Sequence, residues 1–308
     1  MSERVETEVD GRRLSLSNLD KVLYPGTGFT KAGVIDYYAR IAEVMVPHLA
    51  DRPVTFRRYP NGVDGPSFFG KNAPSGAPSW LRTVTVQSIS NRSKRKGSDS
   101  EAVSYPVCDD RPTLIWAANL AAIEIHVPLW RIGSATELPA PPDHLVFDLD
   151  PGPGTSVVEC ARIATWLQDR LENEPVDDPV AKTSGSKGLQ VYARYRDAPD
   201  WPTARERAHE LAKAVAADHP ELVVTNMRKD LREGHVLIDW SQNHPVKTTV
   251  AVYSLRARPE PTVSTPVTWD EVHDCERAED PSLLRYVATE VLDRVERYGD
   301  LFGSLVSG

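Results

Sequence analysis

Three aspartates lie within or at the end of otherwise apolar segments of this 308-residue sequence. Asp148 and Asp150 belong to the run HLVFDLD at 144–150, and Asp239 ends the run VLID at 236–239. Residues two apart in a β-strand point to the same side, so Asp148 and Asp150 would repel each other unless a cation lies between them. Carboxylate oxygens and substrate phosphates are the ligands that Mg²⁺ and Mn²⁺ take. The three aspartates therefore predict a two-metal site that activates a hydroxyl nucleophile and stabilises a leaving pyrophosphate.

Each aspartate also has a plainer interpretation, which the residues alone leave open. Asp148 and Asp150 could be an exposed pair at the end of a strand, before the turn at Pro151 and Gly152. Asp239 could be bonded to a neighbouring backbone group or to Arg232, because an aspartate in an apolar strand needs a partner or a metal.

A loop of small residues, SGSKG at 184–188, follows the apolar start of another predicted strand. Small residues let backbone N–H groups approach phosphate oxygens, and Lys187 adds a positive charge. The spacing is not that of a Walker A motif, so the loop indicates either another kind of phosphate contact or a simple hairpin turn. Further residues that fit a nucleotide site, though each also fits an ordinary structural or surface role, are His126 on a strand face with Glu124, and Gln242, Lys247 and Arg256.

The elements that must position these side chains follow from hydrophobic periodicity and from capping residues. Strands are predicted at 53–59, 123–127, 144–150 and 236–240, with a strand–turn–strand at 181–195. Helices are predicted at 30–46, 110–122, 156–171, 203–217 and about 280–301; Ser156 with Glu159, and Thr203 with Glu206, form the expected capping boxes. Residues 86–102 are expected to form an exposed loop and 133–143 a Pro-rich connector. Strands and helices mix without strict β–α–β alternation, which favours an α+β fold with a mainly antiparallel or mixed sheet.

Composition narrows the class of protein. The longest apolar runs fall far short of the roughly 20 residues that span a bilayer, and the N-terminus is polar, so we expect a cytoplasmic protein with no membrane partner. Cys108, Cys160 and Cys275 form no C-x-x-C pair, which argues against a disulfide framework and a zinc site. The net charge is −8, but residues 92–96 hold four positive charges, so the charge does not exclude nucleic-acid binding.

Taken together, the motifs resemble the polymerase domain of bacterial ATP-dependent DNA ligase D, a branch of the archaeo-eukaryotic primase superfamily. The matching stretches, in family order, are NLDKVLYP (18–25), RYPNG (58–62), FF (68–69), EIHVPLW (124–130), LVFDLDPG (145–152), TSGSKGL (183–189), DWSQN (239–243) and YSLR (253–256). The resemblance implies one primase-type α+β domain over 1–308, with sheets around an active-site cleft and flanking helices. We expect an N-terminal part (1–105) with a 5′-phosphate pocket, a catalytic part (106–260) and a C-terminal helical part (261–308).

The resemblance also implies an activity: template-dependent nucleotide addition, preferably of ribonucleotides, at short gaps or breaks during gap filling, excision repair or non-homologous end joining. Two Mn²⁺ or Mg²⁺ ions, NTP or dNTP substrates and DNA with a 5′-phosphate are implied, with a separate ATP-dependent DNA ligase and a DNA-end-binding protein as partners at the nucleoid. The implied site residues are Asp148, Asp150 and Asp239 for catalysis and metal; His126, Ser184, Lys187, Gln242 and Arg256 for the nucleotide; Asn18, Lys21 and Lys31 for the 5′-phosphate; Phe68 and Phe69 for stacking on the template; and Arg92, Lys94, Arg95 and Lys96 for the DNA backbone.

Three features depart from the family pattern. Gln190 replaces the histidine that usually follows the SGSKGL motif, and a glutamine can donate a hydrogen bond but carries no charge. The loop that holds Arg92 to Lys96 is longer and more basic than is expected for the family, and the chain holds one domain, as in stand-alone actinobacterial relatives. Two alternatives remain: a haloacid-dehalogenase-type phosphatase, which needs a parallel sheet around its D-x-D strand, and a non-catalytic scaffold that binds DNA ends.

Overall fold

The computed structural model describes residues 4–87, 102–132, 139–177, 179–196 and 198–306. The chain divides into two units, each assembled from separate segments. The first comprises Met1–Ala140, Thr248–Thr262 and Val287–Gly299, and the second Pro141–Lys247, Val263–Tyr286 and Asp300–Gly308. The α+β class and the mixed and antiparallel sheets agree with the sequence-based prediction. The division into parts at 105 and 260 stays a prediction.

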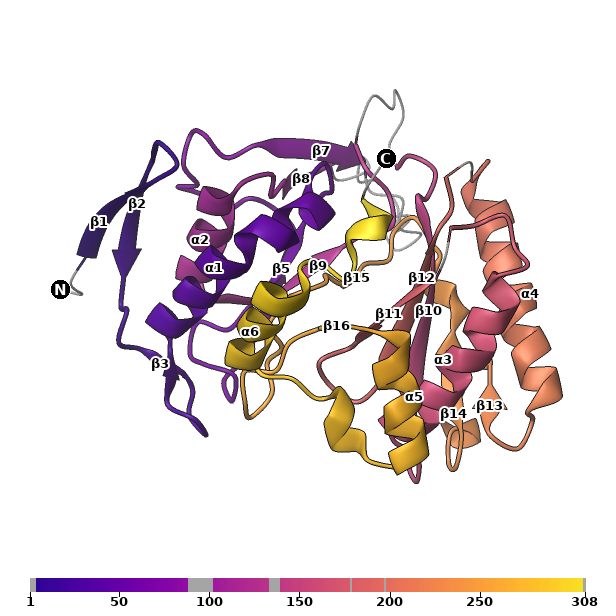
Figure 1. The fold of residues 1–308 in the computed structure, drawn as a ribbon. Helices are drawn as coiled ribbons and strands as arrows, with labels where there is room; N and C mark the ends of the chain where they lie inside the picture. Colours follow the sequence, from indigo (N-terminus) through magenta and orange to yellow (C-terminus); the bar gives the residue numbers. More distant parts are fainter. Residues whose placement is uncertain (1–3, 88–101, 133–138, 178, 197, 307–308) are drawn as a thin grey trace. The chain divides into compact units, whose positions relative to one another are not determined.

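The first unit is built on a four-stranded antiparallel sheet with hairpins around it (Figure 1). The sheet has the order β15 (Thr249–Val250), β9 (Ala122–Val127), β5 (Thr55–Arg58), β6 (Phe68–Gly70). The paired strands outside it are β1 (Arg4–Val9) with β2 (Arg12–Ser17), β3 (Val22–Tyr24) with β4 (Phe29–Thr30), and β7 (Thr83–Gln87) with β8 (Ala102–Pro106). Its helices are α1 (Lys31–Leu49), α2 (Arg111–Asn119) and α6 (Ala288–Tyr298).

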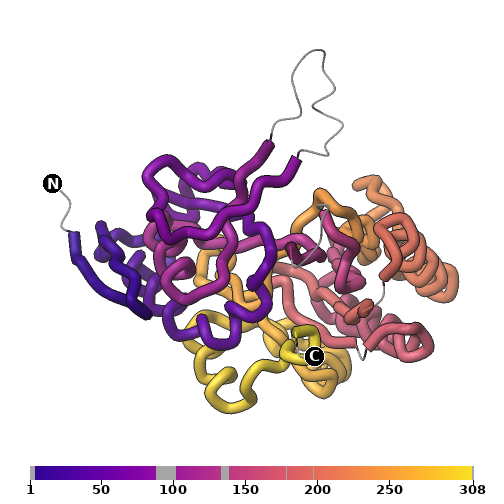
Figure 2. The backbone as a smooth tube through the Cα atoms, turned by 90° about the horizontal axis from the view of Figure 1, so that it is seen from above, coloured from indigo at the N-terminus to yellow at the C-terminus, as the bar shows by residue number. Residues whose placement is uncertain are grey.

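Helix α1 begins where the sequence predicts, because the Thr30 hydroxyl accepts the backbone N–H of Gly33. Tyr38 and Met45, which lie on its apolar face, are completely buried. Helix α6 packs against α1, so the yellow C-terminal segment of this unit lies beside its indigo N-terminal part (Figure 2).

The second unit is built on a six-stranded sheet whose strands β10 and β12 are central. The strand order is β13 (Val223–Val224), β14 (Val236–Asp239), β10 (His144–Pro151), β12 (Leu189–Arg194), β11 (Val180–Thr183), β16 (Pro266–Val267). Only β13 and β14 pair in parallel within this sheet. The helices are α3 (Val157–Leu171), α4 (Trp201–Asp218) and α5 (Trp269–Ala278), and short 3-10 turns are η2 (Lys229–Leu231), η3 (Trp240–Gln242), η4 (Pro281–Leu284) and η5 (Gly303–Leu305).

Strand β10 separates the apolar core of this unit from its polar face. Leu145, Phe147 and Leu149 alternate along the strand and are completely buried in the cluster that includes residues of α3 and α4. Because neighbouring side chains in a strand point to opposite faces, Asp148 and Asp150 lie on the face away from these helices. The apolar alternation thus fixes the direction of the two carboxylates.

Four element predictions need correction. Helix α4 is capped by Asp200, which accepts the N–H of Thr203, and not by Thr203 itself. Helix α2 ends at Asn119 because Ala121 has a left-handed backbone (φ 56°). The predicted last helix is two elements, η4 and α6, because Arg285 is extended and the following Val287 forms a bridge with Thr262. The predicted loop at 86–102 overlaps the ends of β7 and β8, and the rest of it, 88–101, lies outside the described residues.

Candidate active site

A row of polar side chains crosses four strands of the six-stranded sheet at one level. Lys182 on β11 pairs with Gln190 on β12, Gln190 with Asp148 on β10, and Asp148 with Asp239 on β14. Directly opposed residues on antiparallel strands lie on the same face, with Cβ atoms about 5 Å apart. Asp150, two residues further along β10, lies on that face as well. The strand register therefore gathers all three predicted aspartates.

The three carboxylates act on one another electrostatically. Burial raises the pKa of Asp148 to about 7, and the charges of Asp150 and Asp239 act in the same direction. The hydrogen bond from Gln190 Nε2 to Asp148 Oδ1, 2.9 Å long, opposes this shift. Partly buried carboxylates that repel one another in this way are stabilised in their ionised form by a cation.

The donor set fits hard divalent ions, since it consists of carboxylate oxygens. Within the described part of the chain, no group of three acidic, histidine or cysteine side chains is already gathered closely enough to hold an ion. Asp239 already has hydrogen-bond partners: its Oδ1 accepts from the N–H and the hydroxyl of Ser241, and its Oδ2 accepts from Gln242 at 2.8 Å. Each carboxylate oxygen has two lone pairs, so Oδ2 can accept this hydrogen bond and still ligate an ion.

Lys182 and Gln190 form a buried link to Asp148. Lys182 is 1% exposed, and its Nζ donates to Gln190 Oε1 at 2.5 Å and to Ser264 Oγ at 2.7 Å. Gln190 is thereby held at both ends of its amide, with its nitrogen on Asp148. The residue that departs from the family histidine thus contacts a candidate metal ligand. Lys182 was missed from the sequence, although a lysine inside the strand VAKT was a usable signal.

The SGSKG loop is the tight turn between β11 and β12. The Ser184 hydroxyl accepts the N–H groups of Ser186 (3.2 Å) and Gly188 (3.1 Å), which folds the loop back on itself. Gly188 is required here, because a Cβ at this position would stand 2.0 Å from the carbonyl oxygen of Leu149. Lys187 is exposed at the tip of the turn. Ser184 therefore orders the loop, and Lys187 remains able to contact an anion.

Residues after Asp239 tie the carboxylate strand to the next segment. The Asn243 side chain donates to the carbonyl oxygen of Val146 (2.7 Å) and accepts its N–H (3.0 Å), which joins this segment to β10. Lys247 Nζ donates to Ser241 Oγ and lies 3.9 Å from Asp239 Oδ2. Positive charge thus lies beside the third aspartate.

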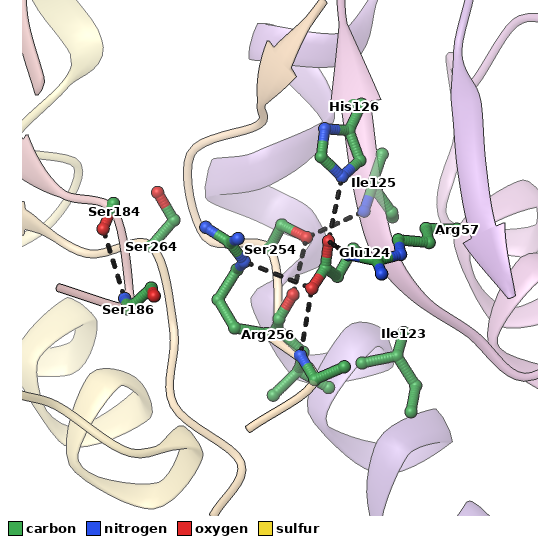
Figure 3. Close-up of polar contacts among 12 residues, drawn as sticks. Arg57, Ile123, Glu124, Ile125, His126, Ser184, Ser186, Ser254, Arg256 and Ser264 are labelled. Atoms are coloured by element: carbon green, nitrogen blue, oxygen red, sulfur yellow. Dashed lines mark hydrogen bonds and ion pairs between the residues drawn. The ribbon is translucent and has the colours of Figure 1, made fainter. Parts of the chain in front are cut away.

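The first unit carries a separate charged cluster centred on Glu124 of β9 (Figure 3). One carboxylate oxygen lies 3.0 Å from His126 Nε2 and 3.6 Å from Arg57 Nη1, and the other 3.4 Å from Arg256 Nε. The second oxygen also accepts the N–H of Ala257 at 3.2 Å. Glu124 is 2% exposed, so these partners offset the cost of burying its charge. The cluster assembles His126 and Arg256, two of the predicted nucleotide residues.

The cluster has one carboxylate and two arginines. Burial acts to raise the pKa of Glu124, but the hydrogen bond from His126 and the charge of Arg256 lower it to about 2. Burial lowers the pKa of His126, and the charges of Arg256 and Arg57 act in the same direction, although the hydrogen bond and charge of Glu124 oppose them. The ring is therefore neutral near pH 7 and donates to Glu124. The cluster therefore has a net positive charge, which suits a polyphosphate.

Phe68 and Phe69 are both exposed, at 48% and 56%, but they lie on opposite faces of β6. Phe69 pairs with Arg57, whose guanidinium lies 5.4 Å from its ring, and its ring centre is 5.7 Å from that of His126. Phe68 is opposite Arg58 in the strand register, and the Arg58 guanidinium lies 5.1 Å from the centre of the Phe68 ring. Of the two rings, Phe69 is the one that lies beside the charged cluster.

Asn18, Lys21 and Lys31 lie near one another in the first unit. Asn18 adopts a left-handed backbone (φ 54°), and its carbonyl oxygen accepts the N–H of Lys21. Lys31 is 5% exposed, and its Nζ donates to the carbonyl oxygen of Ser17 at 2.5 Å. Burial and the nearby charge of Lys21 lower the pKa of Lys31 to about 8. A bound phosphate would offset the repulsion that Lys21 exerts on the charge of Lys31. The predicted DNA-backbone residues Arg92, Lys94, Arg95 and Lys96 lie outside the described residues.

Comparison with known proteins agrees with this geometry. The family model described as "LigD, primase-polymerase domain" matches residues 30–302. Multifunctional non-homologous end joining proteins LigD of Mycobacterium bovis and Mycolicibacterium smegmatis are 45% and 43% identical over 96% and 95% of this chain. The chain spans only 37% and 36% of their lengths. The solved structure "Polymerase Domain from Mycobacterium tuberculosis Ligase D in complex with DNA" matches with a TM-score of 0.85 and 43% identity, over 96% of this chain and 98% of that one.

These matches, with the carboxylate-bearing sheet, define a nucleotidyltransferase of the primase-polymerase type. Within that class, the chain belongs to the LigD primase-polymerase domain family. The predicted family, fold and class of enzyme are thereby confirmed. The phosphatase alternative is wrong, because β10 pairs antiparallel with both of its neighbours whereas that alternative needs a parallel sheet. Among the described residues, no helix is long and apolar enough to cross a membrane.

Proposed function

We propose that this chain extends the 3′ end of a DNA primer under the direction of a template, at short gaps or breaks that carry a 5′-phosphate. The observation that carries the proposal is the opposed pair Asp148 and Asp239 with Asp150 on the same sheet face. Divalent ions bound there would activate the attacking hydroxyl and neutralise the leaving pyrophosphate. The similar LigD proteins are named as non-homologous end joining proteins, which supports a role in that repair pathway.

The protein's own residues supply binding and orientation. Asp148, Asp150 and Asp239 would hold the ions, and Gln190 and Lys182 would keep Asp148 in place. Lys187 and Gln242 would contact the incoming NTP or dNTP, with ribonucleotides preferred. The positively charged cluster of His126 and Arg256 would contact a polyphosphate. Ser184 would act by ordering the loop that carries Lys187.

DNA would be held by other residues. Asn18, Lys21 and Lys31 would bind the 5′-phosphate, and Phe69 would stack on a template base, with Phe68 on the opposite sheet face. Arg92, Lys94, Arg95 and Lys96 would contact DNA phosphates. An ATP-dependent DNA ligase activity would then seal the product, and a DNA-end-binding protein would recruit the enzyme at the nucleoid.

The proposal is tested by primer extension on gapped duplexes with and without a 5′-phosphate, supplied in turn with NTPs and dNTPs, in Mn²⁺, Mg²⁺ or EDTA. We expect metal-dependent addition directed by the template, stronger with the 5′-phosphate and with NTPs. Binding of the same DNA without any nucleotide addition under every condition would overturn the proposed reaction and favour a non-catalytic scaffold.

A further inference from the structure

An open hollow of about 630 Å³ lies within the second unit, between the first turns of α4 and the residues from Trp240 to Pro245. Trp201, Arg205 and His209 line it from α4, spaced four residues apart, so they form one stripe along the helix. Trp240 and His244 line the opposite wall. None of the site residues predicted from the sequence belongs to this lining.

The aromatic rings of the hollow are held in stacked positions. The His209 ring lies 3.8 Å from that of Trp240 with 22° between their planes, and the Arg205 guanidinium lies 5.2 Å from the Trp240 ring centre. The Trp240 indole N–H donates to the carbonyl oxygen of Thr225 at 3.2 Å, which fixes the ring. A planar ligand therefore meets aromatic and guanidinium groups that are already oriented.

Charged groups of both signs lie at the hollow: Arg205 and Glu206 belong to its lining, and Lys213, Glu210 and Lys247 lie near its histidines. Burial, together with the charges of Lys213 and Arg205, lowers the pKa of His209. The pKa of His244 is lowered by burial and by the charges of Arg205 and Lys247. The lowered pKa values favour the neutral form of both histidines, while Arg205, Lys213 and Lys247 are positive and Glu206 is negative. This combination suits a ligand with an aromatic part and an anionic part.

We propose that the hollow binds one unpaired nucleotide, with its base against Trp201 and against the stacked pair of His209 and Trp240, outside the contact between those two rings, and with its phosphate paired with Arg205. Sites for single-stranded nucleic acid combine aromatic stacking with basic groups in this way. The volume is within the range of sites for small ligands. Trp240 directly follows Asp239 at the end of β14, whereas α4, the other wall of the hollow, packs on the sheet face away from the carboxylates. The choice of a nucleotide as ligand rests on the proposed function.

The nucleotide could belong to a DNA strand or be free in solution. Binding is measured by fluorescence anisotropy in EDTA, so that the metal-dependent nucleotide site is silent. The probes are a short oligothymidylate, the same strand with its bases removed, and free thymidine monophosphate as a competitor. We expect the intact strand to bind more tightly than the abasic one. Effective competition by the monophosphate would assign the hollow to a free nucleotide and support the same chemistry.

Trp201→Ala and Arg205→Ala test the lining of the hollow, and Trp80→Ala is the matched control. Trp80 is also partly exposed, with the Arg12 guanidinium 5.5 Å from its ring, but it belongs to the first unit. Loss of one stacked base weakens binding by about fivefold or more. We expect this loss in Trp201→Ala for the intact strand and not for the abasic strand, a weaker affinity for both in Arg205→Ala, and no change in Trp80→Ala.

The two variants together keep the test decisive, with circular dichroism to show that each is folded. The proposal is overturned if both folded variants bind the intact strand and the monophosphate as tightly as the wild type does. It is also overturned if Trp201→Ala loses the same affinity for the intact strand as for the abasic strand. Gapped-duplex extension by the wild type is measured in parallel. If the wild type extends the primer and both variants bind the probes as the wild type does, only the assignment of the hollow is refuted. If the wild type does not extend the primer, the proposed function is refuted.

Discussion

Asp148 on β10 and Asp239 on β14 are directly opposed residues of an antiparallel pair, although 91 positions separate them along the chain. Gln190 approaches the same Asp148 from the other neighbouring strand, and its amide nitrogen lies 2.9 Å from the carboxylate. Asp148 therefore has a negative charge on one side and a hydrogen-bond donor on the other. This asymmetry leads to two predictions.

Asp148→Asn should abolish primer extension, because the amide keeps the shape of the side chain but loses the charge that binds metal. A loss of at least about a thousandfold in rate is expected for a group on which the metal chemistry depends. In EDTA the variant should unfold at a temperature no lower than the wild type, because repulsion by Asp150 and Asp239 is removed. Extension is measured in Mn²⁺, and DNA binding by anisotropy serves as the control. Extension near the wild-type rate would remove Asp148 from the metal ligands.

Gln190→Leu should weaken metal binding, because it removes the hydrogen bond to Asp148 and leaves the buried Lys182 amine without its glutamine partner. Loss of a group that orients a metal ligand typically costs about 10–100-fold in metal affinity or activity. The Mn²⁺ concentration at half-maximal extension should rise accordingly. Gln190→His, which restores the residue usual in the family, is the control and should stay within a few-fold of the wild type. Equal Mn²⁺ requirements for all three proteins would exclude a positioning role for Gln190.

The sequence predicted the strands of the carboxylate site well because their patterns are local. The alternation of Leu145, Phe147 and Leu149 defines both β10 and the direction of its aspartates. The capping box of Ser156 and Glu159 likewise defines the start of α3. These features depend on neighbours a few residues apart, which the sequence displays directly.

Other features depend on contacts between distant segments, and the sequence could not supply them. The extended backbone at Arg285, which separates η4 from α6, accompanies the bridge between Val287 and Thr262. Helix α5 was missed although Thr268 and Glu271 form a capping box, because the helix is short and buries only Val272 and Cys275. The link from Lys182 through Gln190 to Asp148 required the strand order, which no local pattern reveals.

The preference for a 5′-phosphate should decline as pH rises from 7 to 9. Burial and Lys21 lower the pKa of Lys31 to about 8, so its amine loses its charge within this range. A lowered lysine pKa means that the charged form is disfavoured in the free protein. A bound phosphate would raise this pKa again. The ratio of dissociation constants for gapped DNA with a 5′-hydroxyl and with a 5′-phosphate measures this preference.

The Lys21→Ala/Lys31→Ala double variant is the control for this pH effect. It should bind both DNAs equally at every pH, and Lys71→Ala, which changes an exposed lysine elsewhere in the first unit, should behave as the wild type. A constant preference of the wild type between pH 7 and 9 would contradict the assignment of Lys31.

Glu124→Gln should destabilise the first unit and impair nucleotide use. The change removes a buried carboxylate but leaves Arg57 and Arg256 close together, and breaking a buried ion pair on one side costs about 3–5 kcal/mol. Denaturation in urea measures the stability, and the Michaelis constant for NTP measures the binding. An unchanged midpoint and an unchanged Michaelis constant would show that the cluster is dispensable.

The pH dependence of stability provides a second test of Glu124. Its pKa is about 2 in the folded protein, below that of an unfolded glutamate, so it stabilises the fold fully above the unfolded value near 4. That stabilisation should be lost as pH falls from about 4 toward 2. The stability difference between wild type and Glu124→Gln should therefore be large at pH 6 and should shrink below pH 4.

The basic segment at 92–96 should bind DNA through phosphates, without reading bases. Changing Arg92, Lys94, Arg95 and Lys96 to serine removes four positive charges. Each phosphate contact on duplex DNA contributes about 0.9 to the slope of log affinity against log salt, so the quadruple variant should bind more weakly and show a flatter slope. Turnover at saturating DNA should stay near the wild-type value, because these residues provide no carboxylate ligand. Arg12→Ser/Arg13→Ser, which changes another adjacent basic pair, is the matched control for non-specific loss of charge. If the quadruple variant keeps the wild-type salt slope, the segment has no role in DNA binding.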